Sequence, residues 1–223
     1  MIKIILGLML VGLLSLQADT VKNNIKVGLN QSTGATNNNI YTAKFSNIYE
    51  TGFLNSDIEM DWKYQKTNEV IIENQKAINY RLEYNNNLYF PFMITEYLDD
   101  LKQHVNDRYT FGLGYGYYLH KQQNKNISIS LAGLRIDQKE NVYNAGRFEE
   151  RSKYIDLPFV FKQRFYYQKS DGVYNEDYYN QVMIDYMLYK SVSIGVSDTY
   201  TYDNVAIENK SNNKLLINLG YTF

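Results

Sequence analysis

The sequence predicts an all-β protein, a single-chain transmembrane β-barrel of twelve antiparallel strands. Three observations lead to this fold class. Apolar and polar residues alternate with a period of two along most of the chain. The alternating segments are longer than the ~5–6 residues of an average globular strand. Short and long links alternate between these segments, which is typical of barrels in the bacterial outer membrane.

The composition excludes several classes of function. The chain has 223 residues, a net charge of −1 and no cysteine, so thiol catalysis, zinc fingers and iron–sulfur clusters are excluded. Nucleic-acid binding is not expected, because it usually needs a basic surplus. The 23 tyrosines are unusual. A ring with a polar tip suits the boundary between water and an apolar phase.

The N-terminal segment has the pattern of a secretory signal. Lys3 precedes an uncharged, mostly apolar run from Ile4 to Leu16, and Leu16-Gln17-Ala18 offers a cleavage site. This run is too short for a membrane helix, which needs ~20 residues. We therefore predict a signal peptide over residues 1–18, a barrel over residues 19–223, and export to the outer membrane of a bacterium.

The alternation places the strands in order along the chain. From Tyr109 to Leu119 every second residue is apolar, and residues 58–64, 78–84, 192–202 and 215–223 alternate in the same way. Such segments are strands with one apolar and one polar face. The predicted strands are 23–31, 38–49, 55–66, 74–85, 88–97, 108–119, 126–138, 148–157, 159–168, 177–188, 191–203 and 212–223.

The links between these segments determine the strand count. The long links, predicted to be outer loops, are 31–37, 67–74, 98–107, 137–147, 169–177 and 203–213. Two strands must lie between the fourth and fifth of them, and residues 148–157 and 159–168, which meet at Pro158, supply the pair. Residues 148–157 alternate poorly, so ten strands is the fallback. A secreted β-sandwich is the soluble alternative, but it would have shorter strands and more Gly/Pro turns.

Four stretches resemble the family of salt-induced outer-membrane proteins, whose function is unknown. They are GLNQSTGATNNN (28–39), YTFGLGYGYYL (109–119), SLAGLRIDQKE (130–140) and LINLGYTF (216–223). Thr33-Gly34-Ala35-Thr36 departs from the usual Ser-Gly-Asn-Thr of that family. The resemblance implies a single-chain outer-membrane barrel, and it implies neither a reaction nor catalytic residues.

Charged residues on the polar faces of the strands are the candidate lining of the lumen. One hypothesis is a constriction that selects solutes by charge. The favoured alternative is mutual neutralisation in a nearly closed barrel, because an unpaired buried charge is very costly. The candidates are Asp57, Glu59, Asp61, Lys63, Arg81, Glu83, Lys162, Arg164 and Asp185.

Residues that suggest catalysis, cofactors or metals have simpler explanations. Gly112, Gly114 and Gly116 are not followed by a switch to a helix, as a phosphate loop requires, so a smooth inner wall is favoured. His104 has no serine in its own predicted loop to act as nucleophile, although Ser170 or Ser211 could approach from others; His120 lies in a short turn. The acidic set Asp99, Asp100 and Asp107 lacks the spacing of a calcium loop. We predict no enzyme, no cofactor and no metal site.

The tyrosines are predicted to form belts at the two membrane interfaces. One belt contains Tyr64, Tyr84, Tyr97, Tyr109, Tyr166, Tyr167, Tyr178, Tyr179, Tyr200 and Tyr202. The other contains Tyr117, Tyr118, Tyr189 and Phe223.

The predicted function is structural or passive, as a filled barrel or a narrow channel for small solutes and ions. The alternatives are an outer-membrane enzyme that modifies lipid, and a barrel whose long loops bind an external partner. The expected surroundings are outer-membrane lipid, lipopolysaccharide and the barrel assembly machinery, and the chain is expected to be a monomer.

The last strand carries a pattern similar to the assembly signal of bacterial barrels, namely Asn218, Gly220, Tyr221 and Phe223. Recognition would use edge-strand pairing and an aromatic anchor. Deletion of Phe223 should therefore reduce the amount of assembled barrel several-fold. The measurement is the fraction of protein that shows heat-modifiable migration on cold detergent gels. Full insertion without Phe223 would contradict the assignment.

Overall fold

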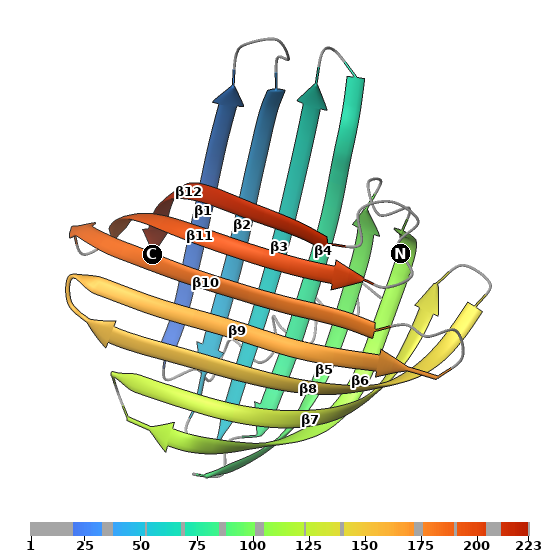
Figure 1. Ribbon diagram of the computed structural model, residues 1–223. Coiled ribbons are helices and arrows are strands. Elements are labelled where there is room, and N and C mark those ends of the chain that lie inside the picture. Colours follow the sequence, from blue (N-terminus) through green and yellow to red (C-terminus); the bar gives the residue numbers. More distant parts are fainter. Residues whose placement is uncertain are drawn as a thin grey trace.

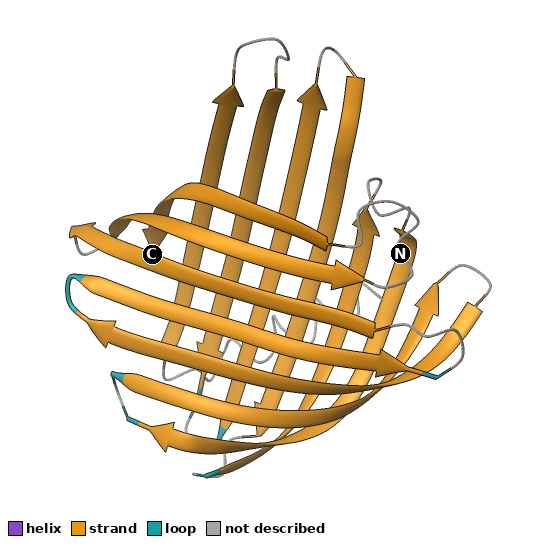
Figure 2. Cartoon of the chain, viewed as in Figure 1, coloured by secondary structure: helices purple, strands orange, loops and turns teal. Residues whose placement is uncertain are grey.

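The structure is a computed structural model that describes residues 20–32, 38–51, 53–67, 70–84, 88–100, 105–122, 124–138, 141–171, 176–189, 191–203 and 211–222. Every regular element in these ranges is a β-strand (Figure 2). Among the described residues, no helix is long and apolar enough to cross a bilayer.

Twelve strands form one closed antiparallel sheet, which confirms the predicted fold class and strand count. In Figure 1, β7–β11 sweep across the front of the barrel and β1–β4 stand behind them. Strand β1 pairs with β12, from Asn24 opposite Thr222 to Val27 opposite Leu219, and this pairing closes the barrel. The strands are β1 (Thr20–Ser32), β2 (Asn38–Glu50), β3 (Leu54–Thr67), β4 (Val70–Tyr84), β5 (Tyr89–Asp100), β6 (Val105–Lys121), β7 (Lys125–Gln138), β8 (Asn141–Asp156), β9 (Phe159–Ser170), β10 (Glu176–Tyr189), β11 (Val192–Asp203) and β12 (Ser211–Thr222).

The strands extend beyond the alternating segments, so three predicted outer loops are largely wrong. Only residues 68–69, 101–104 and 139–140 separate β3 from β4, β5 from β6, and β7 from β8. Strand β8 begins at Asn141, and Gln138 pairs with Asn141 directly across the turn. Backbone pairing needs no apolar face, so the ladder continues where the side chains become polar. Alternation therefore marks the apolar belt of a strand and not the strand itself.

Beyond the end of β9, hydrogen bonds tie Asp171 to β8. The backbone N–H of Asn144 donates to Oδ1 of Asp171 at 2.7 Å, and its side-chain Nδ2 donates to Oδ2 at 3.0 Å. These two bonds favour the carboxylate and lower the pKa of Asp171 below its ordinary value. The described start of this loop is thus held against the neighbouring strand.

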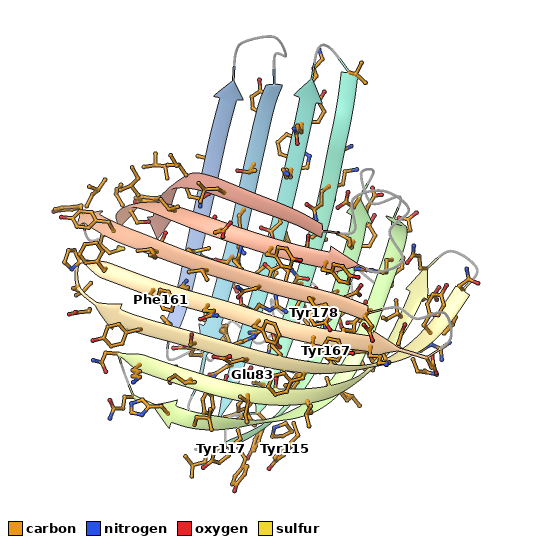
Figure 3. All side chains as sticks on the ribbon, in the orientation of Figure 1. Glu83, Tyr115, Tyr117, Phe161, Tyr167 and Tyr178 are labelled. Atoms are coloured by element: carbon orange, nitrogen blue, oxygen red, sulfur yellow. The ribbon has the colours of Figure 1, made fainter. Side chains whose placement is uncertain are left out.

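The outward face of the barrel carries an apolar band between two groups of aromatic rings. Leu113, Leu131 and Ile217 are more than half exposed on this face. One end has the ring pair Tyr97–Tyr109, with centroids 5.1 Å apart. It also has the pair Tyr167–Tyr178, at 4.8 Å, whose residues are labelled in Figure 3. The other end has the pairs Tyr89–Tyr117, at 5.1 Å, Phe159–Tyr186, at 5.2 Å, and Phe53–Tyr84, at 6.4 Å. In Figure 3, Tyr115 and Tyr117 project away from this lower end.

Four tyrosines do not lie where the belts were predicted. Tyr84 packs on Phe53 beside the short turns, at the end opposite to its predicted belt. Tyr118 is buried against Phe90, with centroids 4.6 Å apart, on the inner side of the barrel. Tyr166 and Tyr179 stack on each other at 5.0 Å and line a cavity in the lumen. The position of a tyrosine near a strand end therefore does not determine whether its ring lies on the inward or the outward face of the sheet.

The lumen is partly filled by apolar side chains on β5–β8. The buried cluster contains Phe90, Phe92, Ile94, Tyr118, Ala132, Leu134, Ile136 and Ala145. The phenylalanine rings of β5 lie over the glycines of β6, and a Cβ atom added at Gly114 or Gly116 would collide with them. The predicted smooth inner wall at these glycines is therefore a groove that receives side chains of the neighbouring strands.

Candidate functional site

A network of ion pairs crosses the lumen between β4–β5 and β8–β9. Arg147 on β8 donates two hydrogen bonds to the carboxylate of Glu96 on β5, from Nη1 to Oε1 and from Nη2 to Oε2, each 2.6 Å long. Arg164 on β9 donates from Nε to Glu149 at 2.6 Å and lies 3.8 Å from Glu96. We call the set Arg81, Glu83, Glu96, Arg147, Glu149, Arg151 and Arg164 the charged bar.

Glu149 is the centre of the charged bar. Its carboxylate accepts from Arg81 at 2.7 Å, from Arg151 at 2.9 Å and from Arg164 at 2.6 Å. Only 3% of the residue is exposed. A carboxylate taken out of water needs such partners, so three guanidinium groups from three strands (β4, β8 and β9) are held at one point.

Aromatic rings and an amide fix the orientation of these guanidinium groups. Arg81 lies over the ring of Phe92, 3.8 Å from its centroid, and Arg147 lies 4.5 Å from that of Tyr166. Arg147 also donates to Oε1 of Gln168, at 3.0 Å from Nε, and Gln168 donates to Asp177 at 3.0 Å. Guanidinium groups stack favourably on aromatic faces. The bar is therefore a supported structure and not a set of free side chains.

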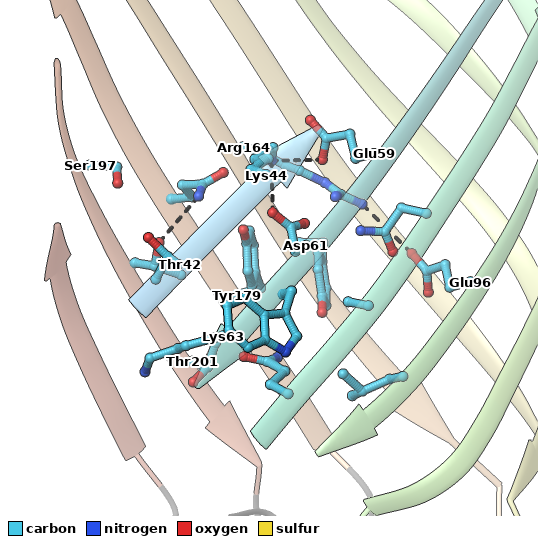
Figure 4. A pocket seen from close by; sticks show the side chains of 18 of the residues that line it. Thr42, Lys44, Glu59, Asp61, Lys63, Glu96, Arg164, Tyr179, Ser197 and Thr201 are labelled. Atoms are coloured by element: carbon cyan, nitrogen blue, oxygen red, sulfur yellow. Dashed lines mark hydrogen bonds and ion pairs between the residues drawn. The ribbon is translucent and has the colours of Figure 1, made fainter. Parts of the chain in front are cut away.

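A second, smaller group of charges lies on β2 and β3. Lys44 is between Glu59, at 3.1 Å, and Asp61, at 3.7 Å (Figure 4). These carboxylates and those of Glu83 and Glu96 come from β3–β5, whereas most of the guanidinium groups come from β8 and β9. The two sides of the lumen thus differ in charge, and the ion pairs of the bar connect them.

Two cavities in the lumen are lined by described residues. The outer cavity has a volume of about 260 Å³ and is lined by the ends of the strands away from the short turns, including Asp61, Arg108 and Thr199. The inner cavity has about 270 Å³ and includes Asn126, Lys153 and Lys162, near the short turns. The two cavities meet at a set of shared residues, namely Lys44, Glu59, Asn79, Glu96, Arg164, Gln181 and Met183. A passage from one of these cavities to the other therefore goes past Glu96 and Arg164 of the charged bar.

The structure places the sequence-predicted charges as follows. Arg81, Glu83 and Arg164 are in the charged bar. Asp61 and Lys63 line the outer cavity, and Glu59 lies between the two cavities. The inner cavity is lined by Asp57 and Lys162. Asp185 is buried close to Gly195, outside both cavities.

Five residues of the charged bar and of the smaller group on β2 and β3 were missed by the alternation. In β8, the consecutive charged residues Glu149, Glu150 and Arg151 obscure the alternation between the inward and outward faces. Phe148 and Tyr154 are an even number of residues apart and are both exposed, so they share the outward face. This pattern could have assigned Arg147, Glu149 and Arg151 to the inward face. In β5, Glu96 shares its face with apolar residues. The missed residues are Lys44, Glu96, Arg147, Glu149 and Arg151.

The residues considered for catalysis and metal binding do not come together in the described structure. His104 lies outside the described residues, and His120 at the end of β6 has an enclosed Nε2 atom with no hydrogen-bond partner. Asp99 lies 3.9 Å from Lys76, and Asp107 accepts from Tyr97 at 3.0 Å. Within the described ranges, no three histidine or acidic side chains are grouped to hold a metal ion.

The described residues of the predicted assembly signal belong to β12. Asn218 is buried and donates to the hydroxyl of Ser197 at 3.0 Å. Gly220 is buried on the same face, and Tyr221 is 51% exposed on the outward face. Phe223 lies outside the described residues.

The fold is similar to that of two solved porins. The NanC porin is 11% identical over 92% of this chain and 99% of its own, with a TM-score of 0.54. The KdgM porin is also 11% identical with the same coverage, and its TM-score is 0.50. No curated protein matches the sequence. The family described as "Protein of unknown function, DUF481" matches residues 25–223, and this chain belongs to that family.

Proposed function

We propose that the protein is an outer-membrane barrel that admits small ions and solutes through a narrow passage at the charged bar. The observation that carries this proposal is the pair of cavities that meet at four charged side chains, Lys44, Glu59, Glu96 and Arg164. The apolar outward band between aromatic groups supports a place in a bilayer. The fold shared with two porins agrees with it.

The charged bar explains why the passage would be narrow. An ion that crosses must exchange its water for charged groups that already bind one another at 2.6–2.9 Å. Rings of such groups select by charge and limit the size of the solute. The proposal is therefore a low-conductance channel, in contrast to the wide aqueous pore of a larger barrel.

Export and assembly are part of the same proposal. Residues 1–18 would be removed as a signal peptide, and Asn218, Gly220, Tyr221 and Phe223 would be read by the barrel assembly machinery. The folded barrel would then lie in outer-membrane lipid, with lipopolysaccharide around its outer aromatic group. Recovery of the protein in a soluble periplasmic fraction would refute this location.

Conductance in planar bilayers tests the passage. The double variant Glu96→Gln, Arg147→Gln replaces the cross-lumen ion pair with neutral amides, so the bar should loosen and the single-channel conductance should rise several-fold. The matched control is Lys169→Gln, Glu176→Gln, which removes an exposed pair with an N–O distance of 3.4 Å. It should leave the conductance unchanged. If neither the wild-type barrel nor the double variant conducts in any salt solution tested, the channel is contradicted and a structural role is favoured.

A further inference from the structure

The inner cavity contains a carboxylate and an ammonium group that do not bind each other. Asp57 lines this cavity from β3, and its enclosed Oδ1 atom accepts no hydrogen bond. Lys162 lines it from β9 and forms no ion pair within the described part of the chain. Asp57 is attracted at longer range by Arg151, Lys44 and Lys162. Within the described residues, however, neither Asp57 nor Lys162 has a hydrogen bond or a close ion pair, which buried charges normally have and which a bound molecule could supply.

The neighbours of Asp57 explain why it is unpaired. Arg81 lies directly opposite Asp57 in the register of β3 and β4. The guanidinium group of Arg81, however, is directed to Glu83 and Glu149 of the charged bar. The other cross-strand neighbour, Ile48, has no polar group. The carboxylate of Asp57 is thus left to face the cavity.

The neighbours of Lys162 concentrate positive charge on the opposite wall. Lys153 lies directly across from Lys162 in the register of β8 and β9, and both line the inner cavity. Like charges at directly opposed positions repel each other. An anionic group bound at Lys162 would relieve this repulsion. The wall at β8–β9 therefore favours an anion, and the wall at β3 favours a cationic hydrogen-bond donor.

We propose that the inner cavity is a binding site for a small zwitterion with an ammonium and a carboxylate group, such as an amino acid. The ammonium group donates to Asp57, and the carboxylate accepts from Lys162 beside Lys153. The volume of about 270 Å³ lies below the range of ~300–1,000 Å³ for drug-sized pockets and suits a molecule of this size. This inference rests on the proposed channel, since it names the class of solute that the channel would hold.

Equilibrium binding to the folded barrel in detergent micelles tests the site without reference to conduction. The probes are glycine and γ-aminobutyrate, with acetate and methylammonium as probes that carry one charge each, and the readout is isothermal titration calorimetry. At least one zwitterion should bind saturably, and each single-charge probe should bind at least about tenfold more weakly, because it satisfies only one wall. Acetate that binds as tightly as both zwitterions would show a simple anion site and overturn the proposal. No saturable binding of either zwitterion would also overturn it.

Variants then assign the two ends of the bound molecule. Asp57→Asn should weaken the binding of the zwitterion about tenfold or more and leave that of acetate unchanged, whereas Lys162→Gln should weaken both. Asp61→Asn in the outer cavity and Lys169→Gln on the outward face are the matched controls. Heat-modifiable migration shows that each variant is folded, and Asp57→Glu should retain binding. An equal loss in Asp57→Asn and Asp61→Asn would contradict the assignment.

The binding result and the conductance result can be separated. Binding of the zwitterion by a barrel that conducts no ion would refute the channel and leave the site standing. Conduction of ions with no binding would refute the site and leave the channel standing.

Discussion

Replacement of Gly114 with alanine is expected to destabilise the barrel by about 1–3 kcal/mol, the usual cost of overpacking a well-filled core. Its added Cβ would collide with the ring of Phe92 and with the backbone oxygen of Leu131. The ring cannot simply turn away, because the guanidinium of Arg81 covers its face at 3.8 Å. The measurement is the free energy of unfolding in urea, with the barrel inserted in lipid vesicles.

Gly133 on the neighbouring strand provides the matched control. A Cβ added at Gly133 meets no atom within 4 Å, and Gly133 lies opposite Leu113 in the β6–β7 register. Gly133→Ala should change the free energy of unfolding by no more than about 0.5 kcal/mol. An equal decrease in the free energy of unfolding in Gly114→Ala and Gly133→Ala would mean that the glycine groove does not receive the side chains of β5.

Replacement of Glu149 with glutamine is expected to cost about 3–5 kcal/mol, the range for removing one partner of a buried ion pair. Three guanidinium groups share this carboxylate. Glutamine offers only one acceptor oxygen and no charge, so the three cations would repel one another in the lumen. The same urea unfolding experiment measures the loss.

The control for Glu149 is Glu176→Gln on β10. Glu176 pairs with Lys169 at 3.4 Å, and the side chain of Lys169 is 60% exposed. Exposed ion pairs contribute little, typically below about 1 kcal/mol. A loss at Glu149 as small as that at Glu176 would show that the charged bar contributes nothing to the stability of the barrel.

The sequence predicted the strand count and the outward face because both follow from local patterns. The alternation from Tyr109 to Leu119 marks an apolar face that the structure places outward, with Leu113 61% exposed. The turn at Pro158 was predicted from the rhythm of the links, and the structure has β8 and β9 on its two sides. These inferences need only residues that are close together in the chain.

The charged bar could not be predicted because its contacts join distant strands. Arg81 and Glu149 are 68 residues apart in the sequence, and no local pattern relates them. Strand β5 turns Phe90 and Phe92 inward, against the expectation that a lumen face is polar, because the glycines of β6 leave room for their rings. Tyr166 and Tyr179 also turn inward, and their rings lie beside the guanidinium groups of Arg147 and Arg164.

Cysteine labelling tests most directly whether the barrel lies in a bilayer with a water-accessible lumen, because the chain has no cysteine of its own. Thr199 lines the outer cavity, and Val196 on the same strand is exposed on the outward face. In lipid vesicles, Thr199→Cys should react with a small hydrophilic thiol reagent, whereas Val196→Cys should react only with a lipid-soluble one. Equal reaction of both positions with the hydrophilic reagent would contradict a membrane barrel, and no reaction at Thr199→Cys would contradict an accessible lumen.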